Sequence, residues 1–579
     1  MAEATWALRR TIDADHPHYR WVALSNTTLG MLMATINSSI VMISLPAIFR
    51  GIHIDPLAHG NVSYLLWMIM GFLLVTAVLV VSVGRLGDIY GRVRIYSMGF
   101  AIFTAASIAL ALDPLTGGGG ALWLIIWRVV QGVGAAMLFA NSAAILTDAF
   151  PPDRRGMAMG INQVAAIAGS FIGLIAGGLL SEVDWRLVFF VSVPFGLLGT
   201  IWSYASLREI GERSPARIDV WGNLTFGLGL TAILVAITYG IQPYGGSTMG
   251  WTNPWVDAGL VGGAALLAVF CIIETKVPEP MFHMQLFRIK AFSAGNLAGW
   301  LASIARGGMQ FMLIIWLQGI WLPLHGYKFA DTPLWAGIYL LPLTIAFLAA
   351  GPISGYLSDR FGARAFATGG LLIVAASFAG LMALPTNFPY WEFAALLAIN
   401  GIGSGLFSSP NTTAIMNAVP ASTRGAASGM RSTFFNSGTS LSIGIFFSLM
   451  ILGLAHNLPH TLTSGLEAHH VPSNIATAIG NAPPVASLFA AFLGYNPIQT
   501  LLGPHVLSTL PPADAAVLTG RTFFPSLIAG PFHDGLVVVF AMAIAMSVIG
   551  AVASLFRGAR YVHDEAERRP TATPAAQGA

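Results

Sequence analysis

The stretch GRLGDIYGRVR, Gly84 to Arg94, has a degenerate second copy 271 residues later, where residues 355–363 read GYLSDRFGA. A second pair of segments repeats at nearly the same offset: residues 138–160 read LFANSAAILTDAFPPDRRGMAMG, and residues 406–429 read LFSSPNTTAIMNAVPASTRGAASG. Two separate segments that share one offset indicate an internal duplication. The chain is therefore predicted to consist of two structurally related halves.

The composition places most of the chain out of contact with water. Of its 579 residues, 55% are hydrophobic and 9% are charged, whereas soluble domains carry about 25% charged residues. Apolar stretches long enough to cross a bilayer, which takes about 20 residues, recur from end to end. These stretches do not alternate as barrel strands would, so the fold class is predicted to be all-α integral membrane. The net charge of +3 gives no indication of nucleic acid binding.

Fourteen apolar segments are predicted to span the membrane. They lie at residues 22–48, 62–83, 95–112, 121–147, 156–180, 186–206, 219–240, 255–277, 293–321, 335–357, 366–385, 391–417, 427–454 and 533–556. Parallel repeats of six spans are typical of the major facilitator architecture, so the first six and the last six spans should form two bundles. Spans seven and eight are left between the bundles as extra central helices.

This division also predicts the domain organisation. The predicted units are a cytoplasmic N-terminal tail (1–21), a six-helix bundle (22–207), two linker helices (219–277), five helices of the second bundle (291–454), an extracytoplasmic loop (455–532), the last helix (533–556) and a cytoplasmic tail (557–579).

The distribution of basic residues predicts the orientation. With both termini placed in the cytoplasm, 22 arginine and lysine residues fall on the cytoplasmic side and 4 fall outside. This asymmetry follows the positive-inside rule, and it would be lost if a span had been missed. The first twenty residues lack the short apolar core of a cleaved signal peptide. We therefore expect a multi-pass protein of the bacterial plasma membrane.

The loop at 455–532 is rich in proline, glycine, alanine and histidine. Its apolar run Val485–Leu493 is too short to cross and is expected on the bundle or at the membrane interface. Four dispersed histidines could suggest a metal site, but solvated side chains are the expected reading, and no metal is predicted: His456, His460, His469 and His470. The single cysteine, Cys271, excludes an intramolecular disulfide and is expected to be a small apolar filler.

The repeated loop motif is predicted to act as a conformational switch. Its glycines allow tight turning, and Asp88 can cap a helical turn and pair with Arg92 or with a neighbouring helix. The stretch resembles the cytoplasmic signature of the major facilitator superfamily. The predicted switch residues are Gly84, Asp88, Gly91, Arg92 and Asp148 in the first half and Gly355, Asp359, Gly362 and Arg364 in the second.

Two arginines lie within predicted spans. Arg128, in RVVQGVGAA, resembles the second motif of the superfamily, and Arg306 lies near the centre of span nine. A charge at bilayer depth costs roughly 2.5–3.5 kcal/mol on insertion scales, so such residues are functional candidates, with bonding to backbone carbonyls as the structural alternative. The predicted substrate or coupling residues are Asn37, Arg128, Gln131, Arg306, Gln310 and Gln318.

Span five has glycines at the spacing of the antiporter motif of drug exporters: Gly160, Gly169, Gly173 and Gly177. The motif normally has proline after its third glycine, where this chain has Leu174. Glycines at this spacing also let helices pack closely, so a purely structural packing face is the alternative.

Further stretches resemble the fourteen-span drug:proton antiporter family: WRLVFFVSVPFG at 185–196, residues 219–240, and EPMFHMQLFR at 279–288. The stretch RGGMQFMLIIWLQGIWLP at 306–323 is similar to an actinobacterial subgroup. The resemblance implies a secondary efflux transporter that exports amphipathic drugs in exchange for protons.

One departure from that family concerns its first helix, which typically reads Leu-Asp-x-Thr-Ile-Val. Here residues 36–41 read INSSIV, so that Asn37 replaces the membrane-embedded acid, and an amide cannot titrate. Asp148 working with Asp88 and Arg92 is one possible substitute. A cavity without an acid should favour an anionic, zwitterionic or neutral lipid-like substrate, whose charged head Arg128 and Arg306 would meet.

The sequence therefore predicts a monomeric secondary exporter of amphipathic drugs or lipid-like compounds that works by alternating access. No nucleotide motif, catalytic triad or cofactor site is evident, and the proton gradient is the expected energy source. Two alternatives remain: an exporter of lipids or envelope precursors without classical proton antiport, and a non-transporting membrane receptor or assembly factor.

Overall fold

A computed structural model describes residues 16, 18–54, 60–151, 154–210, 219–247, 249–420, 423–494 and 496–557. The two terminal tails lie almost entirely outside these residues. Fourteen of the described helices are long and apolar enough to cross a membrane, which confirms the predicted number. The first bundle comprises α2 (Tyr19–Gly51), α3 (Asn61–Tyr90), α4 (Arg92–Ala111), α5 (Gly117–Ala149), α6 (Arg155–Val183), and the pair α7 (Leu187–Phe190) and α8 (Ser192–Ser206).

The linker helices are α9 (Val220–Gly240) and α10 (Pro254–Lys276), followed by the short η1 (Met284–Arg288). The second bundle begins with a span made of α11 (Lys290–Trp316), the π-helical turn η2 (Leu317–Trp321) and α12 (Leu322–Leu324). It continues with α13 (Thr332–Tyr339) and α14 (Leu341–Phe361), α15 (Ala363–Ala383), α16 (Tyr390–Asn417), α17 (Arg424–Glu467) and α22 (Phe523–Leu555).

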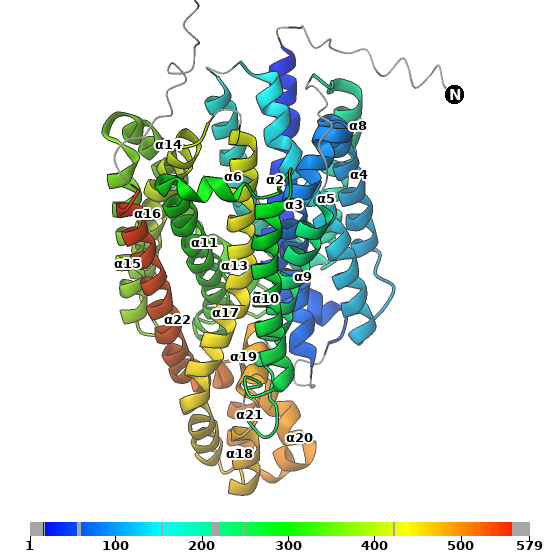
Figure 1. Cartoon of the computed structure of the whole chain (residues 1–579). Coiled ribbons are helices and arrows are strands. Elements are labelled where there is room, and N and C mark those ends of the chain that lie inside the picture. Colours follow the sequence, from blue (N-terminus) through cyan, green and yellow to red (C-terminus); the bar gives the residue numbers. More distant parts are fainter. Residues whose placement is uncertain are drawn as a thin grey trace, which may run out of the picture.

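The two bundles stand side by side (Figure 1), with α9 and α10 in the middle of that view. Helix α9 packs against α10, α3 and α17, and α3 also packs directly against α17. The extra pair therefore lies beside the junction at which the two bundles meet, as the repeat had predicted.

The start of α2 and the end of α22 lie at the same end of the molecule, at the top of Figure 1. The turns between α3 and α4 and between α14 and α15 belong to this end, which we call the arginine-rich end. The opposite, distal end holds the helices that follow α17.

The internal duplication is visible in the backbone. Gly91 ends α3 at φ 111° and ψ 128°, and Gly362 ends α14 at φ 91° and ψ 143°. Both conformations lie in the positive-φ region that strongly favours glycine, which explains why the motif has glycine at these two positions. A Cβ atom on Gly84 would lie 3.8 Å from Ala140, and one on Gly355 would lie 2.8 Å from the Ser409 hydroxyl, so the two copies also make the same helix contact.

The region predicted as a loop at 455–532 is largely helical, which corrects two span boundaries. Helix α17 continues to Glu467 and α22 begins at Phe523, so the last two spans extend well beyond 454 and 533. Between them lie α18 (Ser473–Gly480), α19 (Pro484–Phe492), α20 (Pro497–Thr509) and α21 (Pro512–Leu518). Short segments bounded by proline gave no spanning signal in the sequence, although each can form two or three helical turns.

Helix α19 is the apolar run that was too short to cross, and it packs on the bundles. Its side chains from Val485 to Phe492 are buried, apart from the partly exposed Ala486. The Phe489 ring meets Phe49 of α2 edge-on at a centroid distance of 5.6 Å, and Phe492 meets Phe311 of α11 at 5.9 Å. The helix therefore contacts both bundles and covers their junction at the distal end.

Candidate functional site

Arg128 of α5 lies in a closed polar network inside the first bundle. Its guanidinium donates to the side-chain oxygens of Asn37 at 2.5 Å and Gln131 at 2.8 Å, and to the carbonyl of Met68 at 3.3 Å. The ring of Phe72 covers the guanidinium at 4.3 Å. All of these partners come from α2, α3 and α5, so the cation is held by dipoles of its own bundle.

The side-chain amide groups of Asn37 and Gln131 also find hydrogen-bond acceptors. Asn37 donates to Ser192 of α8 at 3.3 Å, and Gln131 donates to Ser107 of α4 at 2.8 Å. Arg128 is only 1% exposed and lines neither of the two described cavities. Arg128 is thus held mainly by side-chain amides and by one backbone carbonyl, that of Met68. The structure does not bring Asn37, Arg128 and Gln131 to a cavity with Arg306.

A cavity of about 750 Å³ lies in the second bundle, between α11, α15, α16, α17 and α22. Its walls combine aromatic side chains such as Trp300, Phe347 and Phe407 with amides and hydroxyls such as Asn400 and Ser404. No aspartate or glutamate is among its lining residues. Apolar walls with a few polar groups are typical of small-molecule sites.

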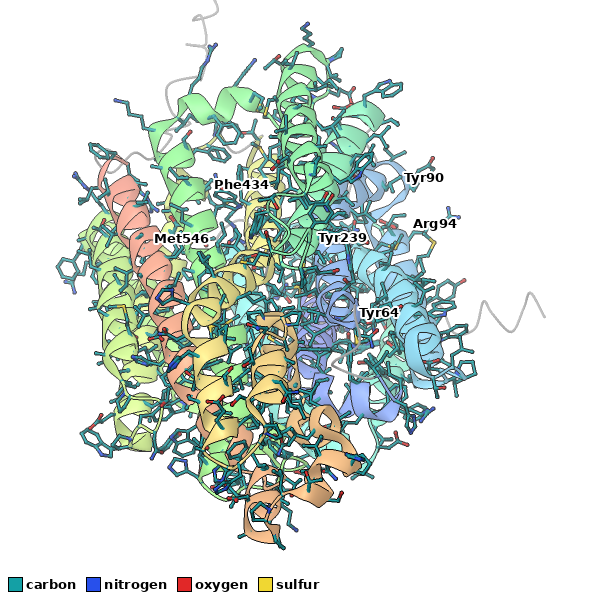
Figure 2. The ribbon with its side chains drawn as sticks, turned by 90° about the horizontal axis from the view of Figure 1, so that it is seen from below. Tyr64, Tyr90, Arg94, Tyr239, Phe434 and Met546 are labelled. Carbon is teal, nitrogen blue, oxygen red and sulfur yellow. The ribbon has the colours of Figure 1, made fainter. Side chains whose placement is uncertain are left out.

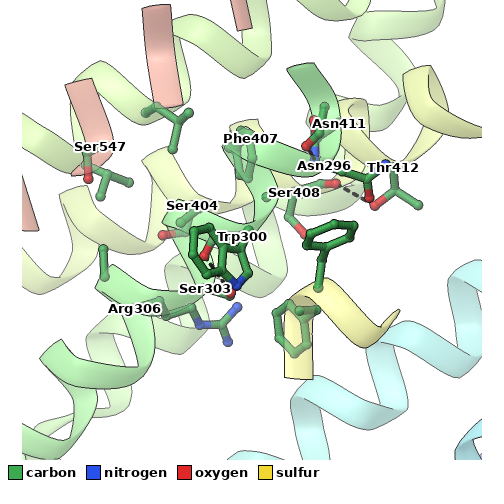
Figure 3. A pocket seen from close by; sticks show the side chains of 18 of the residues that line it. Asn296, Trp300, Ser303, Arg306, Ser404, Phe407, Ser408, Asn411, Thr412 and Ser547 are labelled. Atoms are coloured by element: carbon green, nitrogen blue, oxygen red, sulfur yellow. Dashed lines mark hydrogen bonds between the residues drawn. The ribbon is translucent and has the colours of Figure 1, made fainter. Parts of the chain in front are cut away.

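Arg306 is one of the charged residues that line this cavity. Figure 3 shows its guanidinium directed into the open centre of the pocket. The guanidinium lies 4.8 Å from the centre of the Phe347 ring, and no hydrogen bond or ion pair is seen for it among the described residues. Arg306 therefore has donors free to meet a ligand, unlike Arg128.

Two further arginines lie toward the arginine-rich end of the same cavity, and neither was singled out in the sequence. Arg431 lines the wall, bonds to Thr412 at 3.4 Å, and keeps a buried Nε without a partner among the described residues. Arg557 donates to the side chain of Asn411, which also lines the cavity. Burial lowers the pKa of Arg557 to about 10, so this side chain stays charged at neutral pH.

The positions of Arg431 and Arg306 along their helices show how deep each side chain lies from the arginine-rich end. Arg431 lies seven residues into α17 and Arg306 lies sixteen residues into α11, and both helices begin at the arginine-rich end. At 1.5 Å per residue these positions are about 10 Å and about 24 Å deep. An anion entering from that end would meet Arg431 before it meets Arg306.

A second cavity of about 530 Å³ shares Arg306, Phe347, Asn400 and Ser404 with the first. It extends to α6 of the first bundle through Ile167, Ser170 and Leu174, and Gln310 lines it. Arg306 therefore lies where the cavity of the second bundle reaches the first bundle, and Gln310 lines the second cavity with it.

Gln318 has a different position. It lies in η2, is 1% exposed, and donates to the carbonyl of Ile43 in α2 at 3.1 Å. A π-helical turn shifts the register of a helix, and such turns often occur at functional sites. Here the turn gives Gln318 a contact between the two bundles at the distal end, and Gln318 lines neither described cavity.

The glycines of α6 divide between two neighbours. Gly169, Gly173 and Gly177 face α2, where Cβ atoms on them would come within 3 Å of backbone carbonyls. Gly160 has open space around it, so it does not belong to this packing face. The next glycine, Gly178, instead approaches Leu334 of α13, so the helix contacts the second bundle near the distal end.

The first copy of the switch motif is assembled within one bundle. Arg92 donates to Asp88 at 2.9 Å and to Asp148 of α5 at 2.6 Å. Arg92 thus pairs with both Asp88 and Asp148, the two acids that the sequence analysis grouped with it. In the second copy Arg364 is exposed, and the side chain of Asp359 lies outside the described part of the chain.

The Major Facilitator Superfamily model matches residues 27–277 and 223–443. The chain belongs to the major facilitator superfamily. It is thus a multi-pass membrane transporter rather than an enzyme.

Several curated relatives are drug-resistance proteins. The tetracenomycin C resistance and export protein of Streptomyces glaucescens is 27% identical, covering 93% of this chain and 91% of its own length. The multidrug resistance protein Stp of Mycobacterium tuberculosis is 30% identical over 76% of this chain and 78% of its own. Among solved structures, a bacterial homologue of the human lysosomal transporter Spinster, inward-facing and unoccupied, has a TM-score of 0.58 at 16% identity, covering 94% of this chain and 99% of that one. This likeness supports the fold.

Proposed function

We propose that this protein is a secondary active exporter of amphipathic organic compounds that carry an oxyanion. The observation that carries the proposal is Arg306, whose guanidinium donors are free in a cavity with aromatic walls and without an acidic lining residue. A guanidinium binds carboxylate, sulfonate or phosphate oxygens through paired, charge-assisted hydrogen bonds, and the aromatic walls suit a flat apolar body. The names of the resistance and export relatives support the direction of transport.

The arrangement of the two ends supports alternating access with a cavity loaded from the arginine-rich end. At the distal end the bundles are joined by Gln318, by α13 against α6, and by α19. We place the arginine-rich end in the cytoplasm on the basis of the positive-inside distribution. Rocking of the bundles would then open the distal end and release the substrate outside.

An exporter of lipids or envelope precursors is compatible with the same cavity, because a phosphate head would also meet Arg306. The receptor alternative loses support from membership of a transporter superfamily. Coupling to protons is part of the proposal, since secondary transporters draw on an ion gradient.

The test uses two dyes that differ by one charged group. Anilinonaphthalenesulfonate is an aromatic sulfonate, and phenylnaphthylamine has the same ring system without the sulfonate. Inside-out vesicles that contain the protein should accumulate the sulfonate when energised, and collapse of the pH gradient should stop the accumulation. Because charge-assisted hydrogen bonds contribute about 1.5–3 kcal/mol, Arg306→Gln should weaken sulfonate binding by roughly tenfold to a hundredfold.

The matched control is Arg94→Gln, because Arg94 is exposed at the outer rim of the first bundle (Figure 2). This variant should bind the sulfonate like the wild type, and Arg306→Gln should bind phenylnaphthylamine like the wild type. Equal affinity of the wild type for both dyes, or tighter binding of a lipophilic cation such as tetraphenylphosphonium, would contradict an oxyanion site.

A further inference from the structure

Two buried carboxyl groups face each other in the linker helices, outside the cavity. Glu274, near the end of α10, is 2% exposed, and Asp219, which caps the start of α9, is 9% exposed. A Cβ atom placed on Gly222 would lie 2.3 Å from Asp219 Oδ2 and 2.7 Å from Glu274 Oε1. The two oxygens are therefore at most 5.0 Å apart, so the two carboxyl groups are near neighbours.

Each carboxyl group uses one oxygen and leaves the other without a partner. Asp219 Oδ1 accepts from the backbone N–H of Gly222 at 2.8 Å, and Glu274 Oε2 accepts from that of Phe282 at 2.8 Å. The remaining oxygens, Asp219 Oδ2 and Glu274 Oε1, are both buried and have no donor among the described residues. Two ionised carboxylates at this separation would repel each other, whereas one shared proton supplies the missing donor and removes one charge.

The charged groups around the pair do not replace that proton. Lys276, on the same helix as Glu274, is exposed. Arg85 of α3 is engaged with the Pro280 carbonyl at 2.8 Å and with Glu279 at 3.7 Å. His283 lies on the same connecting segment, and burial together with Arg85 lowers its pKa, so it tends to be neutral there.

The pair is linked to both bundles through residues 279–288. Arg85 anchors this segment to α3 of the first bundle. Phe282, whose N–H bonds to Glu274, packs against Phe434 of α17 at a centroid distance of 6.1 Å. Phe434 lines the cavity of the second bundle and lies between the bundles when the molecule is seen from the distal end (Figure 2). A change of charge at the pair can therefore reach both the bundle junction and the cavity wall.

We propose that Asp219 and Glu274 share one proton and form a proton-binding site of this transporter. Loss of the proton leaves two carboxylates and releases one proton to the arginine-rich side; uptake restores the hydrogen bond Oδ2···H···Oε1. The coupling of this site to export rests on the function proposed above. This site would supply the titratable group that Asn37, an amide, does not provide. It lies in the linker helices, whereas Asn37 lies in the first bundle.

The first experiment detects the proton itself by infrared spectroscopy of the purified full chain in lipid nanodiscs at neutral pH. The wild type should show the carbonyl band of a protonated buried carboxyl group, and Glu274→Gln and Asp219→Asn should each remove that band. Asp184→Asn, at an exposed aspartate, should leave it unchanged. Absence of the band in the wild type, or its persistence in both variants, would overturn the proposal.

The second experiment tests coupling in liposomes that contain a pH-sensitive dye. A gradient of anilinonaphthalenesulfonate should drive proton movement through the wild type, whereas Glu274→Gln should pass the sulfonate with the proton signal lost. Gln copies the shape of the protonated acid, so this variant should fold; Glu274→Asp checks that a titratable group restores the signal. If no variant moves the sulfonate, the proposed function fails while the infrared band still decides the proton site. If Glu274→Gln keeps full proton movement, the coupling role is wrong.

Discussion

Arg128 and Arg306 are both arginines inside spanning helices, and their surroundings separate their roles. Arg128 meets three acceptors and a phenylalanine ring, whereas Arg306 meets one ring and a cavity. The sequence identified both residues because each is a charge at bilayer depth. It could not separate them, because the difference lies in partners that tertiary packing brings from other helices.

The closed network predicts a stability role for Arg128. In Arg128→Met, the oxygens of Asn37 and Gln131 lose their donor and stay buried, which costs about 1–3 kcal/mol for each group. We expect a clear fall in the melting temperature of the protein in detergent. Binding of anilinonaphthalenesulfonate at low temperature should be retained, because Arg128 does not line the cavity.

The matched variant is Arg306→Met, which should show the reverse pattern, with little change in melting temperature and weakened sulfonate binding. If Arg128→Met weakened sulfonate binding without loss of stability, the network would have to be regarded as part of the substrate site.

The carboxyl pair shows a second limit of sequence reasoning. Asp219 is the first residue of the seventh predicted span, and Glu274 lies near the end of the eighth, 55 positions later. Nothing in that spacing predicts contact. Their approach depends on the antiparallel packing of α9 and α10, and the unpartnered oxygens become visible only in three dimensions.

At the scale of helices, long apolar segments were predictable because each spanning helix is encoded by its own composition. The helices after α17 were not, because they are short and bounded by proline. Their stability comes from packing, as the burial of α19 between Phe49 and Phe311 shows. The existence of an apolar run could be predicted, whereas its role in covering the bundle junction could not.

Because α19 depends on packing, truncating one of its buried side chains should loosen the helices around it. Phe489 is fully buried, and Phe→Ala substitutions in cores cost about 3–5 kcal/mol. Since each 1.4 kcal/mol corresponds to a factor of ten, Phe489→Ala should speed amide exchange of α18–α21 by roughly a hundredfold or more if those helices open together. Hydrogen exchange with mass spectrometry would measure this. Leu501→Ala, at a position of α20 where the side chain is 38% exposed, should have a much smaller effect.

The hydrogen bonds that attach α21 to the end of α17 predict that the stability of the protein depends on pH. His469 and His470, after the end of α17, bond to the two oxygens of Asp514 at 3.0 Å and 2.9 Å, and these bonds lower the pKa of that carboxyl group. A lowered folded pKa means that the stabilisation is complete above the ordinary carboxyl pKa of about 4 and is lost as the pH falls through the folded value. The melting temperature of Asp514→Asn should therefore lie below that of the wild type at pH 7, and the difference should be lost only as the pH falls below the ordinary carboxyl range and Asp514 takes up its proton. Equal melting temperatures of the two proteins at pH 7 would contradict this assignment.

At the scale of the whole molecule, the two bundles and the duplication were predictable from the repeated motifs, because each copy encodes the same turn. Which end is closed could not be predicted, since closure depends on contacts between residues far apart in sequence. One such contact lies at the distal end, where α19 is attached to the second bundle by the chain and touches the first bundle through Phe49.

The contact between α19 and the first bundle gives a testable prediction for alternating access. In a background with Cys271→Ala, cysteines at Phe49 and Phe489 joined by a short dithiol-reactive linker should tie the bundles together at the distal end and abolish dye export. Reduction of the linker should restore export. The matched pair, Phe311 and Phe492, has nearly the same ring separation, 5.9 Å against 5.6 Å, but joins α19 to its own bundle, so its cross-link should leave export intact. Export that persists through the first cross-link would mean that substrate leaves without separation of α19 from α2, and a block by both cross-links would mean that α19 must move relative to its own bundle as well.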